Sequence, residues 1–288
     1  MPHLVLLLAA SGVVVAAAAP TCDFRLAEES RYTNFNLSLL GLNTRGKSLC
    51  ANGYFSGSTG KSQTLDDFLA QSEAYVRNET LKLLPVLAGG ARSTDLLVLD
   101  IERPVDYNAL WQYDDGLLAS VVAAVRMRLR VVRSLVPRAP LALYGQQTSS
   151  NATVAAGYVR AAQLGLFDDV DYLAPVLYLG SADQNASHLA EERLGATARF
   201  LTTSKGAHIP MAPLLSWLLF PSRRAASYTQ THDLLDAIDR LSGVLQPQPD
   251  PLPIVHFWSG RDNDTSASGV TQLEWLNGAN IVPKLCLP

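Results

Sequence analysis

Two carboxylates stand two positions apart near the end of an apolar run in the middle of the chain. The run covers residues 96–101, carries Asp100, and is followed by Glu102, Arg103 and Pro104. An apolar run of β-favouring residues that ends at a proline predicts a buried strand. Because side chains on a strand alternate between its faces, Asp100 and Glu102 share one face. An acid pair in such surroundings is costly unless it is ion-paired or takes part in chemistry, so we consider both a strand-end ion pair, for instance with Arg103, and an acid–base centre.

A regular alternation of predicted strands and helices follows this acidic strand. Strands are predicted over residues 141–145, 172–179, 209–217 and 254–258, and helices over residues 115–136, 153–164, 188–202 and 231–241. This alternation favours parallel βα units, and the 288 residues suit a βα barrel, which typically needs about 250. The sequence therefore predicts an α/β fold with a single (β/α) barrel of TIM type, complete or with a degenerate N-terminal third. A doubly wound open sheet is the alternative, but no glycine-rich fingerprint follows an early strand.

The first third of the chain gives weaker signals. Strands are predicted over residues 35–42, 49–55 and 81–87, and a helix over residues 64–76 with Thr64 as its cap. A last short helix is predicted over residues 270–277. Four arginines lie on the predicted helix 115–136, and we expect them to form a solvated outer surface: Arg126, Arg128, Arg130 and Arg133.

Aromatic residues accompany the acids at the ends of the predicted strands. In a βα barrel, catalytic residues gather at the C-terminal ends of the strands. Those ends carry Tyr144, Tyr178, Trp217 and Trp258. Aromatic rings can pack on the apolar faces of sugars while polar groups bind the hydroxyls, so the set predicts a carbohydrate site. For Tyr144 and Trp217, packing in the core is an equally good interpretation.

The spacing of the two acids also bears on mechanism. Most retaining glycosidases hold two carboxyl groups about 5 Å apart, usually from different strands. No other predicted strand end supplies an obvious partner, which favours substrate-assisted catalysis. Glu102 would protonate the leaving oxygen, the N-acetyl carbonyl of the sugar would attack the anomeric carbon, and Asp100 would orient that N-acetyl group. Two alternatives stay open: a two-carboxylate glycosidase that uses the loop residues Asp183 or Asp262, and a lectin that has lost turnover.

Three segments resemble the hyaluronidase family of glycoside hydrolases. The acidic strand reads Val-Leu-Asp-Ile-Glu-Arg-Pro over residues 98–104, a later strand reads Pro-Val-Leu-Tyr-Leu over 175–179, and the last reads Ile-Val-His-Phe-Trp-Ser-Gly over 254–260. The helix with Arg193 and the Ala-Thr-Ala-Arg of residues 196–199 is also similar to the family's, and the match spans about residues 62–260. Chitinase-type barrels share the same combination of Asp-x-Glu, Tyr and Trp.

The resemblance implies an endo-acting glycosidase that hydrolyses O-glycosyl bonds of an N-acetylhexosamine polymer, either hyaluronan-like or chitin-like. By family roles, Glu102 is the acid/base and Asp100 orients the N-acetyl group. Tyr178 helps to hold the N-acetyl carbonyl, and Trp258 walls the site. We expect Tyr144, Trp217 and Arg103 to contribute to substrate binding as well.

The N-terminus has the pattern of a secretory signal. Residues 4–15 are apolar and residues 16–19 are small, so we expect a signal peptide over residues 1–19 and a glycosidase-like barrel over residues 20–288. The apolar run is short for a membrane span, and we expect no stable membrane insertion after its removal. Five Asn-x-Ser/Thr sequons fit a secreted, extracellular or lumenal glycoprotein: Asn36, Asn78, Asn151, Asn185 and Asn263.

The cysteines, the net charge and the metal-binding motifs that are absent limit the disulfides, partners and cofactors that the sequence predicts. Cys22 could pair with Cys286 or with Cys50 in an oxidising compartment, and the sequence does not choose. The formal net charge is −3 and there is no basic stripe, so we expect a polysaccharide rather than a nucleic acid as partner. Neither CxxC nor HExxH occurs, and we expect no metal and no cofactor.

Overall fold

The strands of the computed structural model form two parallel four-stranded sheets. The structure describes residues 24–29, 47–50, 64–84, 96–101, 104–145, 151–205, 209–216, 219, 225–241, 254–258, 275 and 285–286. The first sheet has the order β2 (Lys47–Cys50), β3 (Leu97–Asp100), β4 (Leu141–Tyr144) and β5 (Tyr172–Ala174). The second has the order β6 (Leu214–Ser216), β7 (Ile254–Trp258), β1 (Phe24–Glu29) and β8 (Leu285–Cys286). Every strand pair in both sheets is parallel.

The two sheets meet along a seam between β5 and the chain that leads into β6. Leu173 and Met211 form a parallel bridge there. The amide of Leu173 donates to the Pro210 carbonyl at 2.9 Å, and the amide of Ala212 donates to the Leu173 carbonyl at 2.7 Å. On the other side β1 lies against β2. The described strands β1 to β7 therefore follow one another around a ring in chain order, which is the order of a βα barrel.

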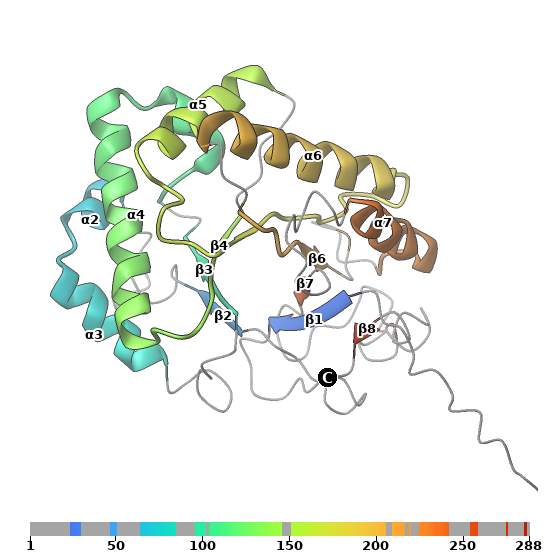
Figure 1. Ribbon diagram of the computed structural model, residues 1–288, viewed down its shortest axis with the longest axis horizontal. Helices are drawn as coiled ribbons and strands as arrows, with labels where there is room; N and C mark the ends of the chain where they lie inside the picture. Colours follow the sequence, from blue (N-terminus) through green and yellow to red (C-terminus); the bar gives the residue numbers. More distant parts are fainter. Residues whose placement is uncertain are drawn as a thin grey trace, which may run out of the picture.

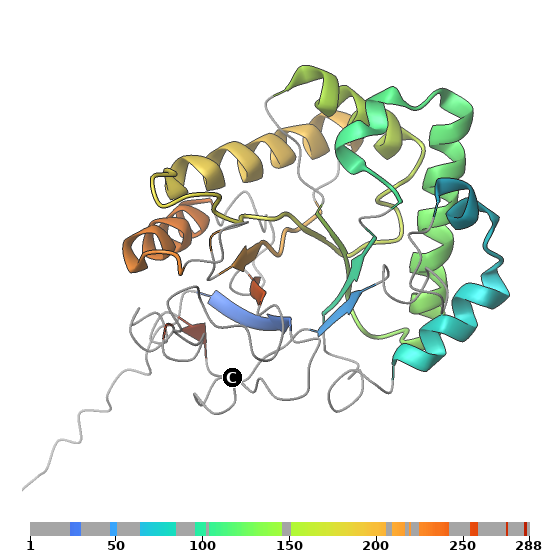
Figure 2. The ribbon, with the colours of Figure 1, turned by 180° about the vertical axis from the view of Figure 1, so that it is seen from behind.

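Helices cover the outside of this ring (Figure 1). They are α2 (Leu65–Ala70), α3 (Glu73–Leu83), α4 (Asp115–Leu135), α5 (Ala152–Gln163), α6 (Ala186–Lys205) and α7 (Tyr228–Arg240), with a 3₁₀ helix, η2 (Tyr107–Gln112), between β3 and α4. The reverse view shows α4, α5 and α6 outside the strands as well (Figure 2). Polar side chains cap several of these helices, and Asp114 and Ser227 accept backbone N–H groups at the starts of α4 and α7.

The apolar core has two layers, which correspond to the two faces of the strands. Leu97 and Leu99 pack with the helices in the outer layer. Leu96 and Val98 pack in the inner layer, together with Ala142, Tyr144, Ala174, Val176 and Ala212. The alternation predicted for residues 96–101 is therefore observed, and the inner layer is the one that carries the even-numbered positions of β3.

Several elements differ from the sequence predictions. The predicted helix 64–76 is two helices that meet at Gln71 and Ser72, although Thr64 does form the expected cap and a full capping box with Asp67. The predicted strand 81–87 is wrong for residues 81–83, which belong to α3. Residues 85–87, the predicted strand 35–42 and residues 51–55 lie outside the described residues, as does most of the predicted helix 270–277, of which Trp275 is helical.

Prolines shorten two of the predicted strands. β5 ends at Ala174 rather than 179, because Pro175 follows it and has no N–H to donate to a ladder. β6 is confined to residues 214–216 for the same reason, since Pro210 and Pro213 interrupt the predicted strand 209–217. The other predicted strands and helices after residue 96 are confirmed to within a few residues at each end.

The expectation that the four arginines of α4 form a solvated surface is wrong for Arg128, which is buried, and it did not foresee that the other three are bound by aspartates. Arg128 is fully buried, lies 3.5 Å over the Phe68 ring, and donates to the carbonyls of Ala124 and Phe68 and to the Gln71 side chain. Burial lowers the pKa of Arg128 to about 10. Because these contacts join α2 to α4, this arginine is a structural residue.

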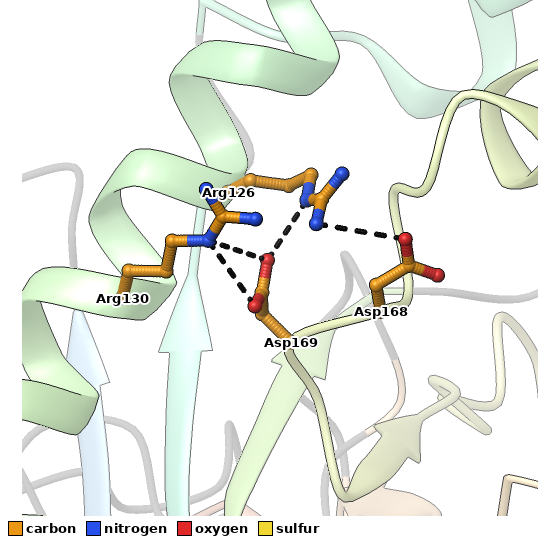
Figure 3. Close-up of polar contacts among 4 residues, drawn as sticks. All are labelled: Arg126, Arg130, Asp168 and Asp169. Carbon is orange, nitrogen blue, oxygen red and sulfur yellow. Dashed lines mark hydrogen bonds and ion pairs between the residues drawn. The ribbon is translucent and has the colours of Figure 1, made fainter.

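The other arginines of α4 are bound by aspartates of the loop between α5 and β5 (Figure 3). Arg126 Nε donates to Asp169 Oδ2 at 2.8 Å, and Arg130 Nε donates to both Asp169 oxygens at 3.1 and 3.2 Å. Arg126 also lies 3.5 Å from Asp168, and Arg133 pairs with Asp171. The aspartates precede β5, so this network lies at the amino end of the strand, opposite the end at which the site was predicted.

Within the part of the chain that the structure describes, no helix is both long and apolar enough to cross a bilayer.

Candidate functional site

Asp100 lies at the C-terminal end of β3, on the inner face of the strand. Its side chain is 7% exposed. In the ladders, Cys50 of β2 pairs with Asp100, and Leu99 pairs with Leu143 of β4. Asp100 and Tyr144 are the last residues of β3 and β4. The parallel register therefore brings the carboxylate predicted to orient the substrate and one of the predicted aromatic residues to the same end of the sheet.

Tyr144 and Tyr178 are brought together although 34 residues separate them. The Tyr144 hydroxyl donates to the Tyr178 hydroxyl at 3.4 Å. The chain after β5 keeps the alternation of the strand, because Tyr172, Ala174, Val176 and Tyr178 all pack in the inner layer. Tyr178 is thus presented to the inside of the ring by an extended segment that continues the line of β5.

The segment around Tyr178 is fixed on both sides by side chains. Arg193 of α6 donates to the Val176 carbonyl at 2.5 Å, and burial lowers the pKa of this arginine. Two residues after Tyr178, the amide of Gly180 donates to the Gln184 side chain at 2.6 Å. These bonds restrict the backbone on either side of the tyrosine.

A buried phenol lies close enough to Asp100 to interact with it electrostatically. Tyr107, the first residue of η2, is 6% exposed. Burial raises the pKa of Tyr107 well above its ordinary value, and the charges of Tyr158 and Asp100 raise it further. The phenol therefore keeps its proton at any physiological pH, and the carboxylate of Asp100 has a neutral, polarisable neighbour.

Of the remaining predicted substrate-binding and catalytic residues, the structure describes Trp258. It ends β7, in register with Ser216 of β6 and Glu29 of β1. Glu102, Arg103 and Trp217 lie outside the described residues, so their positions stay predictions.

Glu29 is a residue that the sequence analysis missed. It is the last residue of β1, and its register partner is Trp258. β1 was not predicted because only Phe24 and Leu26 alternate in it before two acids follow. The backbone register therefore places a second acidic residue at a strand end, level with Trp258.

The remaining polar candidates are less central. Asp183 is exposed in the loop that follows Tyr178, and Asp262 lies outside the described residues. Among the residues that the structure describes, no group of three or more His, Cys, Asp or Glu side chains is arranged to hold a metal ion. Cys286 lies on β8, in backbone register with Arg25 of β1, and Cys50 lies on β2, in register with Asp100 in the other sheet. Cys22 lies outside the described residues.

Three of the five sequon asparagines can be located. Asn78 is exposed on α3, and Asn151 and Asn185 are exposed at the starts of α5 and α6. The side-chain oxygen of Asn151 accepts from the Thr153 amide at 2.9 Å, and that of Asn185 accepts from the His188 amide at 2.9 Å. Capping uses the oxygen, whereas a glycan attaches to the nitrogen, so the two roles are compatible. Asn36 and Asn263 lie outside the described residues.

Comparisons with known proteins find the fold of this chain in several solved structures. No protein-family model matches the sequence, and no curated protein matches it. Among solved structures, bee venom hyaluronidase is similar, with a TM-score of 0.63 and 14% sequence identity over 90% of this chain and 99% of the other. Bee venom hyaluronidase in complex with a hyaluronic acid tetramer gives 0.61 and 14% over 91% and 98%. A GH5-4 broad-specificity endoglucanase from an uncultured bacterium gives 0.52 and 12% over 86% and 71%. At these identities the likeness is one of fold.

Proposed function

We propose that the chain is a secreted, endo-acting glycoside hydrolase that cleaves an N-acetylhexosamine-containing polysaccharide. The observation that carries the proposal is that Asp100 and Tyr144 end neighbouring strands, and that Tyr178, on the segment that continues β5, meets Tyr144 through its hydroxyl. A fold shared with bee venom hyaluronidase, which has been solved in complex with a hyaluronic acid tetramer, supports it. We further propose that residues 20–288 form a single glycosidase-like βα barrel.

The proposed reaction is substrate-assisted and retains the anomeric configuration. The carboxylic acid of Glu102 gives its proton to the glycosidic oxygen as the bond to the anomeric carbon breaks. The N-acetyl oxygen of the same sugar attacks that carbon and forms a cyclic intermediate with positive charge on its ring nitrogen. The carboxylate of Asp100 stabilises this charge, and Tyr178 holds the N-acetyl oxygen in line. Water then opens the ring, with the Glu102 carboxylate accepting its proton.

The buried position of Asp100 suits this role. A carboxylate that is removed from water acts on a nearby developing charge more strongly than a solvated one, because the local dielectric constant is lower. The same burial makes the carboxylate costly unless it is paired or takes part in chemistry.

The experiment is reducing-sugar release from a panel of hyaluronan, chondroitin, chitin and peptidoglycan. Release from at least one polymer with internal N-acetylhexosamine supports the proposal, and the panel identifies the substrate. Glu102→Gln should abolish turnover and retain sugar binding, because the amide keeps the shape of the acid without its transferable proton; general acid catalysis contributes about 10²–10⁴-fold. Activity within a factor of a few of the wild type would remove Glu102 from the acid role. Binding without release in the wild type would identify a lectin instead.

Secretion and glycosylation belong to the same proposal and have their own test. Protein collected from the medium of a eukaryotic host should lack residues 1–19 and should lose mass on enzymatic removal of N-linked glycans. An intracellular product of unchanged mass would contradict this part.

A further inference from the structure

Gln230 joins two parts of the molecule that are far apart in sequence. It is the third residue of α7, and its side chain is 7% exposed. Its side-chain oxygen accepts from the amide and the hydroxyl of Ser227 at 3.4 and 3.2 Å, which completes the capping box of α7. Its side-chain nitrogen donates at 3.1 Å to the carbonyls of Ser181 and Gln184. One buried amide thus caps its own helix and binds the loop that follows Tyr178.

The bonds made by the nitrogen go beyond what the helix cap requires. Glutamate is as suitable as glutamine at the third position of a capping box, because only the acceptor oxygen is used there. The nitrogen makes both bonds to the loop 181–184, and Gln184 of that loop receives the Gly180 amide at 2.6 Å. A continuous chain of hydrogen bonds therefore runs from α7 through Gln184 to the backbone two residues after Tyr178.

We propose that Gln230 is a positioning residue for Tyr178, acting through the Gln184 loop; this inference rests on the proposed function, in which Tyr178 holds the reacting N-acetyl group. Arg193 fixes the backbone before the tyrosine, and Gln230 fixes it after the tyrosine. Misplacement of a reacting group by about 1 Å costs about 10²-fold in rate, so loss of this support should appear in kcat more than in KM.

Two substitutions separate the loop support from the helix cap. Gln230→Glu keeps the acceptor oxygens of the capping box and removes the two N–H donors, placing a carboxylate oxygen against two carbonyl oxygens. Ser227→Ala removes the capping hydroxyl and leaves the Gln230 nitrogen in place. We expect Gln230→Glu to lower kcat about 10–100-fold, more than its loss of stability accounts for, and Ser227→Ala to lower the melting temperature with kcat within twofold of the wild type.

The pH profile gives a signature that a purely structural role does not produce. The carboxyl group introduced in Gln230→Glu is buried and faces two carbonyl oxygens, which raise its pKa above that of a free glutamate; once protonated, it regains one O–H donor for a loop carbonyl. The ratio of variant to wild-type kcat should therefore rise as the pH falls through this raised pKa. A flat ratio, or a loss of kcat in Ser227→Ala equal to that in Gln230→Glu, would overturn the inference.

A readout without substrate distinguishes this inference from the proposed function. 3-Fluorotyrosine placed at position 178 should show a shifted ¹⁹F resonance in Gln230→Glu and an unshifted one in Ser227→Ala. If the wild type cleaves no polymer, the proposed function fails while the ¹⁹F comparison still decides whether Gln230 positions residue 178. If the resonance does not move in Gln230→Glu, the inference fails even when the wild type is active.

Discussion

Substituting Gly157 by alanine tests whether η2 is seated against α5 as closely as the structure shows. A Cβ added at Gly157 would lie 2.5 Å from the Trp111 nitrogen, 3.0 Å from the Trp111 Cα and 3.1 Å from the Leu110 carbonyl carbon. All three are backbone atoms of η2, which cannot rotate out of the way as a side chain can. Alanine stabilises a helix by about 1 kcal/mol relative to glycine, whereas overpacking costs about 1–3 kcal/mol. The difference lowers the free energy of unfolding of Gly157→Ala by up to about 2 kcal/mol.

Gly195 provides the matched control, because it also lies inside a helix, α6. The nearest atom to a Cβ there is Arg199 Nη1 at 3.4 Å, the end of a flexible side chain. Gly195→Ala should therefore stabilise by about 0.5–1 kcal/mol. Urea unfolding measures both effects as changes in midpoint at constant slope. A Gly157→Ala protein stabilised as much as the Gly195→Ala protein would show that η2 and α5 are not in close backbone contact.

Three further predictions concern the carboxylates and the substrate. Glu29→Gln should retain turnover within about tenfold of the wild type, because the proposed nucleophile belongs to the sugar. Glu28→Gln, at the neighbouring position of β1, is the control and should do the same. A loss in Glu29→Gln as large as in Glu102→Gln would instead establish a two-carboxylate mechanism, in which carboxyl groups about 5–9.5 Å apart act together. A neutral N-acetylglucosamine polymer should be cleaved at least as well as hyaluronan, and cleavage should depend weakly on salt. The reason is that the α4 arginines are bound by aspartates at the far end of the strands and so do not attract a charged substrate. Cleavage of both polymers is measured at low and high ionic strength, and a strong preference for hyaluronan that falls steeply in salt would contradict the prediction. Asp169→Asn should lower the free energy of unfolding at neutral pH. Partial burial raises the pKa of Asp169, but Arg126 and Arg130 outweigh this effect and leave the pKa below its ordinary value. The carboxylate therefore stabilises the protein above the ordinary aspartate range, and this stabilisation is lost as the pH falls through the lowered pKa. Thermal unfolding of both proteins from pH 7 to pH 2 should show the difference shrinking with acid, and a constant difference would argue against the ion pairs as its source.

The second half of the fold could be predicted because its signals are local and strong. The helix 115–136 has an apolar stripe, an acidic cap at Asp114 and an abrupt end, and the structure reproduces it as α4. The inward face of β3 followed from period-two alternation alone. These features depend on residues that are adjacent or one helical turn apart, and no tertiary contact has to be known in advance.

The parts that were missed depend on contacts distant in sequence. β1 is a strand because β7 and β8 pair with it, although four of its six residues are charged or small. Arg128 has buried Ala124, Val125, Val131 and Val132 three and four positions away, but its charge predicted exposure; the Phe68 ring and the end of α2 supply the contacts that let it be buried.

The hydroxyl pair of Tyr144 and Tyr178 ties the end of β4 to the chain that follows β5. At 3.4 Å this bond is at the weak end of its class, so it costs little to break. Under the proposed function, a sugar hydroxyl would take the place of one phenol as the partner of the other. The link between these two segments would then depend on whether the site is filled.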